Sequence, residues 1–245
     1  MRPILLQWRG FVIWSYPAML YLGLLTGILA GNAAAHAAGL DPFRAYCATL
    51  TLLVAGLIGG RLFHIARRWR WYRSHPGHFW NRSEGGTAMY GGFLAMLPLS
   101  IPLLAALRLP FAVFWDTMVF TTLVLLIFAR FGCLMHGCCS GRPSRSFIGV
   151  RLPNAAGVWE RRLPTPLLEA TCCAGLLLFA VTTWWSLPFP GALALVSGAG
   201  YGAGRLVLQS TRESEPSAAR FTLHHAISLA LVVLSLFELH IRWPK

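Results

Sequence analysis

Long apolar blocks alternate with shorter polar segments along this chain. Seven blocks, each about 20 residues long, contain few charged side chains, and they cover residues 11–31, 45–65, 88–108, 111–132, 165–187, 190–209 and 221–240. A helix of this length spans the hydrocarbon core of a bilayer, which is about 30 Å thick. The pattern therefore predicts an all-α polytopic membrane protein with about seven transmembrane helices. It indicates no second domain, so we expect residues 1–245 to form a single integral membrane domain.

Two longer polar loops separate these blocks, at residues 66–87 and 133–164. The third and fourth blocks are divided only by "RLP", and the fifth and sixth are joined by "LPFPG". Proline breaks a helix, so both pairs are predicted to form tight helical hairpins. The first block is long enough to span a bilayer, and we expect it to remain as a helix and not to be removed as a signal peptide.

Composition agrees with a membrane location and adds a strong positive charge. The chain is 56% hydrophobic and only 12% charged, about half the charged fraction of a typical soluble domain. Its 21 Lys and Arg residues exceed its 8 Asp and Glu residues, for a net charge of +13. In a membrane protein such an excess indicates loops on anionic headgroups, or pockets for phosphate-bearing lipids. We therefore expect anionic phospholipid as a partner, and no nucleic acid.

Three arginines lie within or at the end of apolar blocks: Arg61, Arg130 and Arg205. A charge at membrane depth costs several kcal/mol and marks a functional candidate. Arg61 can alternatively extend its long side chain to the headgroups. Arg205 follows Tyr201 by four residues in a glycine-rich helix, so both side chains share one face. A phenol and a guanidinium on one face predict the wall of a phosphate pocket.

Tyr90 and Glu169 each have two interpretations. Tyr90 lies between two Gly-Gly pairs in "EGGTAMYGGFL". The glycines indicate either a helix crossing or a cavity into which the Tyr90 hydroxyl projects as a donor or acid/base group. Glu169 lies about one turn into the fifth block, where the helix dipole favours an acid. It can alternatively pair with an intramembrane arginine.

The stretch "RFGCLMHGCCSG" contains Cys133, His136, Cys138 and Cys139 in a polar, glycine-rich setting. These residues can form a metal site, a disulfide, a reactive thiol whose pKa Arg130 and His136 would lower, or simple packing. Zinc sites more often contain C-x2-C pairs, so we expect no bound metal and no cofactor. Cysteines inside apolar blocks are expected to be packing residues.

Motifs in order along nearly the whole chain resemble the prolipoprotein diacylglyceryl transferase family. They are "SYPAML", "GGRLFHI", "EGGTAMYGGFL", "RFGCLMHGCCSGRP", "PTPLLEA" and "YGAGRLVLQSTRESEP", followed by a closing apolar block. The resemblance implies a seven-helix enzyme that moves the diacylglyceryl group of phosphatidylglycerol onto a lipobox cysteine and releases glycerol phosphate. It makes Arg130 and Arg205 catalytic, with Tyr90 or His136 handling the acceptor's proton. The expected substrate-binding residues are Tyr16, Tyr201, Arg61, Gly141, Arg142, Glu169, Gln209 and Arg212.

The departures from the family pattern concentrate in the residues expected to handle the acceptor. Where the family reads G-N-F-I-N-G-E, this chain reads "GCLMHGC", so that Cys133 and His136 replace asparagines and Cys138 replaces a glutamate. Tyr90 stands for a histidine, and Gln209 for a glutamate. The resemblance therefore supports phospholipid chemistry more strongly than a lipoprotein acceptor. The alternatives are a different small-molecule or lipid acceptor, or a non-catalytic protein that binds lipid or metal.

Two arguments disagree about membrane orientation. Arginine counting places the loops at 66–87 and 133–164 in the cytoplasm. The resemblance implies a bacterial inner membrane protein whose equivalent loops face the periplasm, where a prolipoprotein signal peptide emerges. A surface that gathers anionic headgroups needs cations wherever it lies. We therefore expect the site to face the periplasm.

Overall fold

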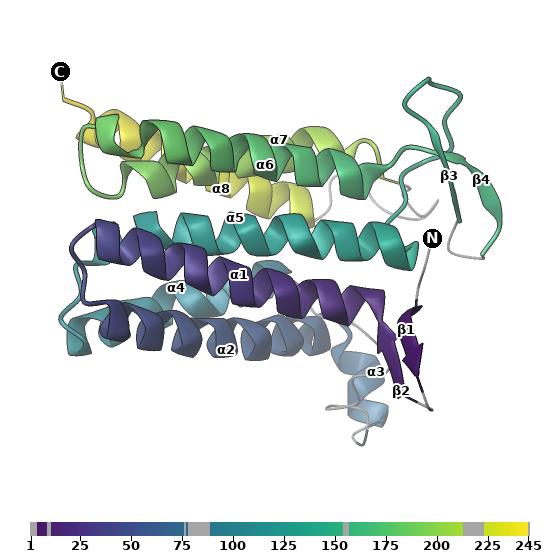
Figure 1. The fold of residues 1–245 in the computed structure, drawn as a ribbon, viewed down its shortest axis with the longest axis horizontal. Helices are drawn as coiled ribbons and strands as arrows, with labels where there is room; N and C mark the ends of the chain where they lie inside the picture. Colours follow the sequence, from purple (N-terminus) through teal and green to yellow (C-terminus); the bar gives the residue numbers. More distant parts are fainter. Residues whose placement is uncertain are drawn as a thin grey trace. The chain divides into compact units, whose positions relative to one another are not determined.

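The computed structural model consists mainly of helices (Figure 1). It describes residues 4–8, 11–75, 77, 89–153, 157–212 and 223–244. The helices are α1 (Ser15–Ala37), α2 (Pro42–Arg67), α3 (Trp69–Ser74), α4 (Met89–Ala106), α5 (Phe111–His136), α6 (Thr165–Thr183), α7 (Ala192–Gln209) and α8 (Leu223–Arg242). A short 3-10 helix, η3, covers Trp184–Ser186. Each predicted apolar block contains a long helix, and the all-α prediction is confirmed.

The long helices have the character of membrane spans. Within the described residues, five helices are long and apolar enough to cross a bilayer: Ser15–Ala37, Pro42–Ala66, Phe111–His136, Thr165–Ser186 and His225–Arg242. Gly91–Ala106 is a shorter apolar helix. Large apolar side chains point outward, and Leu178, Val207 and Leu234 are each more than 60% exposed. Such surfaces are stable in lipid, and the prediction of a polytopic membrane protein is confirmed.

Two β-hairpins were not predicted. Strand β1 (Ile4–Trp8) pairs antiparallel with β2 (Phe11–Trp14), with Trp8 opposite Phe11. The first apolar block therefore begins as a strand, and the prediction of a helix from residue 11 is wrong for its first four residues. "FVIW" is aromatic and β-branched, a composition that favours pairing of strands. The second hairpin, β3 (Val150–Pro153) with β4 (Trp159–Arg162), lies in the predicted polar loop.

The chain divides into two compact units, Met1–Ala34 with Trp115–Lys245, and Ala35–Phe114. In the second unit α2 and α4 cross at glycines. A side-chain carbon added to Gly59 would lie 2.8 Å from the Gly91 carbonyl oxygen, and one on Gly92 would lie 3.0 Å from that of Gly56. These contacts leave no room for larger residues, so the glycine pair after Tyr90 serves a helix crossing. The prediction of one integral domain stays a prediction.

In the first unit α7 packs between α6 and α8, with glycines on both faces. A carbon added to Gly202 would lie 2.9 Å from the carbonyl oxygen of Ser228 in α8. One added to Gly204 would lie 2.6 Å from the sulfur of Cys172 in α6. The glycine run around Arg205 therefore brings three helices together, which is the first condition for assembling a site from all of them.

Asp116 fastens α5 to the start of α7. Its buried carboxylate accepts hydrogen bonds from the backbone N–H of Gly191 at 2.7 Å and of Ala194 at 2.9 Å. These donors belong to the first turn of α7, where a helix lacks internal acceptors and favours an anion. The bond fixes α7 against α5 at the end remote from the arginine cluster described below.

Candidate functional site

Four charged side chains meet inside the first unit. Glu169, near the start of α6, accepts hydrogen bonds at Oε1 from Arg205 Nη1 and from Arg212 Nη2, the latter at 2.8 Å. Its Oε2 lies 2.6 Å from Nε of Arg130, in an ion pair without hydrogen-bond alignment. Of the two interpretations of Glu169, pairing with intramembrane arginines is confirmed. Both predicted catalytic arginines therefore converge on one carboxylate.

This arginine cluster, Arg130, Arg205 and Arg212 around Glu169, is buried and unbalanced in charge. The side chain of Glu169 is 4% exposed, those of Arg205 and Arg130 are 9% and 14% exposed, and Arg212 is the most accessible at 26%. Three guanidinium groups and one carboxylate leave two positive charges. Buried charges are stable only when they are paired. The cluster can therefore accept a further anion, and phosphate matches the fork of a guanidinium group.

A narrow pocket with about 10 Å³ of free space borders the cluster. Its lining consists of Arg130, Glu169, Cys172, Cys173, Tyr201, Gly204, Arg205 and Leu208. Tyr201 and Arg205, one helical turn apart, both line it, as the sequence predicts. Cys172, Cys173, Gly204 and Leu208 form the small and apolar part of the lining.

Gly141 lies where three segments join beside the cluster. Its N–H donates to the Leu163 carbonyl oxygen at 2.9 Å, and the next residue, Arg142, donates to Thr211 at the same distance. A side-chain carbon on Gly141 would lie 2.4 Å from Thr165 Oγ1 and 2.6 Å from the Thr211 carbonyl oxygen. The structure thus places Gly141 in a packing position that holds the segment bearing Arg212 next to α6. Arg142 itself is exposed.

Arg162 completes the junction, and sequence reasoning missed it. Its side chain is only 2% exposed, although it follows another arginine, Arg161. Its Nη1 donates to the Gly141 carbonyl oxygen at 2.8 Å, and its Nε donates to Glu160 at 2.9 Å. Alternation along strand β4 turns one of the two consecutive arginines inward. If the sequence had predicted a strand here, this alternation would have identified Arg162 as an inward-facing residue. The composition of the segment instead predicts a polar loop.

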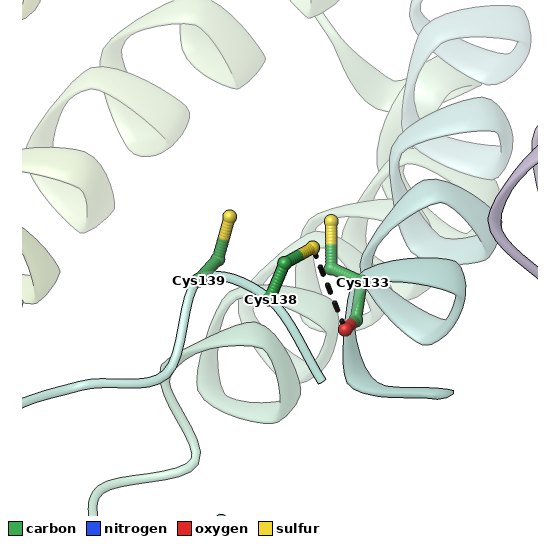
Figure 2. Close-up of side chains that lie close together, drawn as sticks. All are labelled: Cys133, Cys138 and Cys139. Carbon is green, nitrogen blue, oxygen red and sulfur yellow. Dashed lines mark hydrogen bonds between the residues drawn. The ribbon is translucent and has the colours of Figure 1, made fainter. Parts of the chain in front are cut away.

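The three cysteines of the polar stretch come together at the end of α5. Gly137 adopts a left-handed φ of +82°, and its N–H donates to Leu134, while the Cys138 N–H donates to the Cys133 carbonyl oxygen at 3.1 Å. This is the Schellman ending of a helix, in which glycine reverses the chain. The reversal brings Cys138 and Cys139 back over Cys133 (Figure 2), and the three sulfurs lie within 4.8 Å of one another. We call this group the thiol cluster.

Cys138 and Cys139, the two thiols beyond the end of α5, have different environments. The Cys138 thiol donates to the Cys133 carbonyl oxygen at 3.7 Å, and hydrogen bonds with the neighbouring thiols raise its pKa. Hydrogen bonds from Cys133 and Cys138, followed by the charges of Arg212 and Arg130, lower the pKa of Cys139. Cys139 is therefore the thiol of the pair that ionises first. All six cysteines are free thiols in the structure, which therefore gives no support to a disulfide within the thiol cluster.

The remaining predicted site residues are divided between the two units. Tyr16 packs against Gly132 and lies near the thiol cluster and Arg130. His136 ends α5 with an exposed side chain and is not part of the thiol cluster, and Gln209 ends α7. Arg61 belongs to the other unit, where its guanidinium lies 5.7 Å from the centre of the Tyr72 ring. Tyr90 begins α4 in that same unit, and its side chain lies outside the described residues.

Fold and site together define a multi-pass membrane protein with a buried, cation-rich cluster beside a small pocket. The model of the prolipoprotein diacylglyceryl transferase family matches residues 3–241, and the chain belongs to this family. Three relatives named phosphatidylglycerol–prolipoprotein diacylglyceryl transferase are similar to this chain over most of their length. One from Clostridium tetani is 22% identical over 250 residues, 98% of each chain. One from Symbiobacterium thermophilum is 24% identical, over 96% of this chain and 87% of its own. One from Cereibacter sphaeroides (strain ATCC 17029) is 27% identical, over 77% and 74%.

Proposed function

We propose that this protein transfers the diacylglyceryl group of phosphatidylglycerol to a thiol, namely the lipobox cysteine of a prolipoprotein. The observation that carries the proposal is the convergence of Arg130, Arg205 and Arg212 on one buried carboxylate. The excess of two positive charges suits a phosphodiester, which brings one negative charge. Family membership supplies the reaction class, and the cluster supplies a place for the phosphate.

In this reaction the acceptor sulfur attacks the glycerol carbon of the diacylglyceryl group. The carbon–oxygen bond breaks, its electron pair stays on the phosphate oxygen, and glycerol phosphate leaves. The phosphate gains negative charge as the bond breaks. Guanidinium groups fixed in a site of low polarity stabilise that charge in the transition state. Before the lipid binds, Glu169 holds the three guanidinium groups in position and offsets part of their repulsion.

The dimensions of the pocket indicate how the lipid is held. The space left between its lining side chains is about 10 Å³, far below the range of about 300–1,000 Å³ for pockets that enclose a drug-sized molecule. The phosphate would therefore enter only as the lining side chains move apart, with the arginines contacting it and Tyr201 orienting the headgroup. The acyl chains would remain in the bilayer along the exposed apolar side chains of the helices.

We place the site at the periplasmic face of the bacterial inner membrane. Phe147, 91% exposed, lies in the loop between α5 and α6, and Ser186 ends η3, which follows α6 at its other end. In a variant without native cysteines, Phe147→Cys should react with a membrane-impermeant maleimide in intact spheroplasts, and Ser186→Cys should not. The opposite result would place the site in the cytoplasm and argue against a lipoprotein acceptor.

The direct test is a reconstituted transfer assay. Protein in detergent is incubated with phosphatidylglycerol labelled in the glycerol headgroup and with a lipobox peptide, and the products are identified by mass spectrometry. We expect peptide carrying a diacylglyceryl thioether and an equal amount of labelled glycerol phosphate. A peptide with serine in place of cysteine is the control. No release of glycerol phosphate with any acceptor would refute the transferase proposal.

A second candidate, a different acceptor, is favoured by the thiol cluster. It places three sulfurs in the stretch where the resemblance expects asparagine and glutamate. The same assay distinguishes the candidates when every lipid-modified product is analysed. Glycerol phosphate release accompanied by a modified small molecule or lipid, with unmodified peptide, would support the second candidate.

A further inference from the structure

The thiol cluster has no role in the mechanism above, yet its geometry is that of a metal site. Metal–sulfur bonds of about 2.3 Å around one zinc ion place the sulfurs about 4 Å apart. The sulfurs of Cys133, Cys138 and Cys139 all lie within 4.8 Å of one another. They would need to approach by less than about 1 Å, which rotation of thiol side chains provides.

We propose that Cys133, Cys138 and Cys139 bind one Zn²⁺ ion through three thiolates, and that its open fourth position binds the thiolate of the acceptor. The site itself is inferred from this chain's own residues. Its role in activating the acceptor rests on the transferase function proposed above. The sequence predicts no metal here because C-x4-C-C lacks paired C-x2-C spacing. The turn at Gly137 that ends α5 nevertheless brings the three cysteines close together.

Three features favour a metal over a disulfide or simple packing. A disulfide joins two sulfurs at about 2.05 Å and would leave the third thiol of the cluster without a function. Cys139 adopts a left-handed φ of +61°, which costs a non-glycine residue about 1 kcal/mol. Strain of this kind concentrates at functional sites. Here it turns the Cys139 sulfur to the same side as that of Cys133 (Figure 2).

The burial of the three cysteines suits an open coordination position. Catalytic zinc sites use three protein ligands and keep the fourth position for water or substrate. Cys133 is buried and Cys138 half-buried, whereas Cys139 is exposed. The ion would therefore be held from within the protein and remain accessible from the side of Cys139. His136, outside the cluster, does not fill the fourth position.

The position of the thiol cluster places this ion beside the arginine cluster. Cys133 follows Arg130 by three residues on α5, so the two side chains share a face of the helix. Three thiolates and Zn²⁺ carry one net negative charge, and the bound acceptor thiolate adds a second. Arg130 and Arg212 lie near Cys139 and stabilise negative charge there. A sulfur on the zinc would face the phosphate held by the same arginines.

Zinc would replace the general base that a thiol acceptor otherwise requires. A thiol that coordinates zinc loses its proton, which passes to solvent. The zinc-bound sulfur then attacks the glycerol carbon, the carbon–oxygen bond breaks, and glycerol phosphate leaves with the electron pair. The product is a thioether, a weak, uncharged ligand that dissociates and reopens the fourth position. No atom changes its oxidation state, and the reaction requires neither Tyr90 nor His136 as a base.

The metal content of purified protein tests the site. Elemental analysis of protein purified in detergent and dialysed against Zn²⁺ should find about one zinc per chain. Cys133→Ser, Cys138→Ser and Cys139→Ser should each lower zinc affinity by at least about tenfold. Cys47→Ser, which removes a thiol in the other unit, should retain the zinc. Wild-type protein without stoichiometric zinc, zinc retained in all three variants, or copper in place of zinc would overturn the proposal.

The role of the fourth position is tested without any donor lipid. Cobalt substituted into chelator-treated wild-type protein should show thiolate charge-transfer absorption. A lipobox peptide should change the cobalt ligand-field bands, and its serine counterpart should leave them unchanged. Identical spectra with both peptides would overturn the acceptor role. Wild-type protein is used, so folding of a variant does not enter the result.

A transfer assay separates failure of this inference from failure of the proposed function. Chelation should lower transfer to the peptide at least tenfold, and added Zn²⁺ should restore it. Transfer at an unchanged rate in zinc-free protein would overturn the zinc role and leave the transferase intact. Peptide-dependent cobalt spectra without transfer in any zinc-loaded sample would refute the transferase and support the thiol-binding metal site.

Discussion

Replacement of Arg130 separates the chemistry of the arginine cluster from its contribution to folding. Glu169 loses one of three cationic partners in Arg130→Ala, but it keeps Arg205 and Arg212. A buried charge that loses all its partners costs about 3–5 kcal/mol. One lost charged contact out of three, at a side chain that is 14% exposed, should cost about 2 kcal/mol or less. We therefore expect a folded protein with a slightly lower unfolding temperature.

The effect on transfer should be much larger. Removal of one preorganised donor from a developing negative charge typically lowers kcat by about 100- to 1,000-fold. Arg130→Lys should restore little of this loss, because an ammonium group cannot reproduce the two-pronged contact of a guanidinium group with phosphate. The measurement is the initial rate of glycerol phosphate release from saturating phosphatidylglycerol, with thermal unfolding followed in the same detergent.

Two further variants make the result interpretable. Glu169→Gln leaves three adjacent guanidinium groups without their carboxylate, so it should lower the free energy of unfolding by about 3 kcal/mol or more. Arg242→Ala removes an exposed ion pair with Glu238 at the end of α8, and should alter neither stability nor rate. If Arg130→Ala retained more than half of the wild-type rate, the phosphate-clamp mechanism would be refuted.

Three further predictions concern the backbone and thiols near the site. Gly141→Ala should lower stability by about 1–3 kcal/mol in thermal unfolding, because the added carbon would lie 2.6 Å from the Thr211 carbonyl oxygen. Gly175→Ala should not lower it, because no atom of the described residues lies within 4 Å of the added carbon. Cys139→Gly should be about 1 kcal/mol more stable than Cys139→Ser, because glycine accepts the left-handed φ of +61° without strain; equal unfolding temperatures would contradict this. The lowered pKa of Cys139 keeps this thiol ionised as pH falls. In metal-free protein Cys139 should therefore be alkylated much faster than glutathione at pH 6. An alkylation rate equal to that of glutathione would contradict this prediction.

Much of the fold follows from the apolar pattern, because burial in lipid requires continuous apolar helices of a fixed length. The pattern fails where that requirement ends. Residues 11–14 are as apolar as the helix that follows them, but they pair with β1 as a strand. Apolar content alone does not distinguish a strand at the edge of a block from the first turn of a helix. The hairpin of β3 and β4 is hidden for a similar reason, since "VRLP" and "WERR" contain too little alternation to stand out.

The arginine cluster was predictable in part. Arg130 and Arg205 are detectable individually, because charge inside an apolar block is costly and therefore conspicuous. The meeting of these two with Arg212 at Glu169 depends on the packing of α5, α6 and α7, and no local pattern encodes it. Arg212 lies after α7 in a polar segment, where an arginine is unremarkable. Only the family resemblance marks it as a site residue, and its contact with Glu169 depends on Gly141, whose contacts hold that segment against α6.

The spacing within α5 explains how one part of such a site can differ from the family pattern while another part is kept. Arg130 lies on the helix, where its direction is fixed by regular backbone hydrogen bonds and by the ion pair with Glu169. Cys133 begins the last turn, and Cys138 and Cys139 lie beyond Gly137, where the turn and not the helix determines their direction. Replacement of side chains after Arg130 therefore leaves the arginine cluster in place. A change in the chemistry offered to the acceptor requires no change in the residues that face the phosphate.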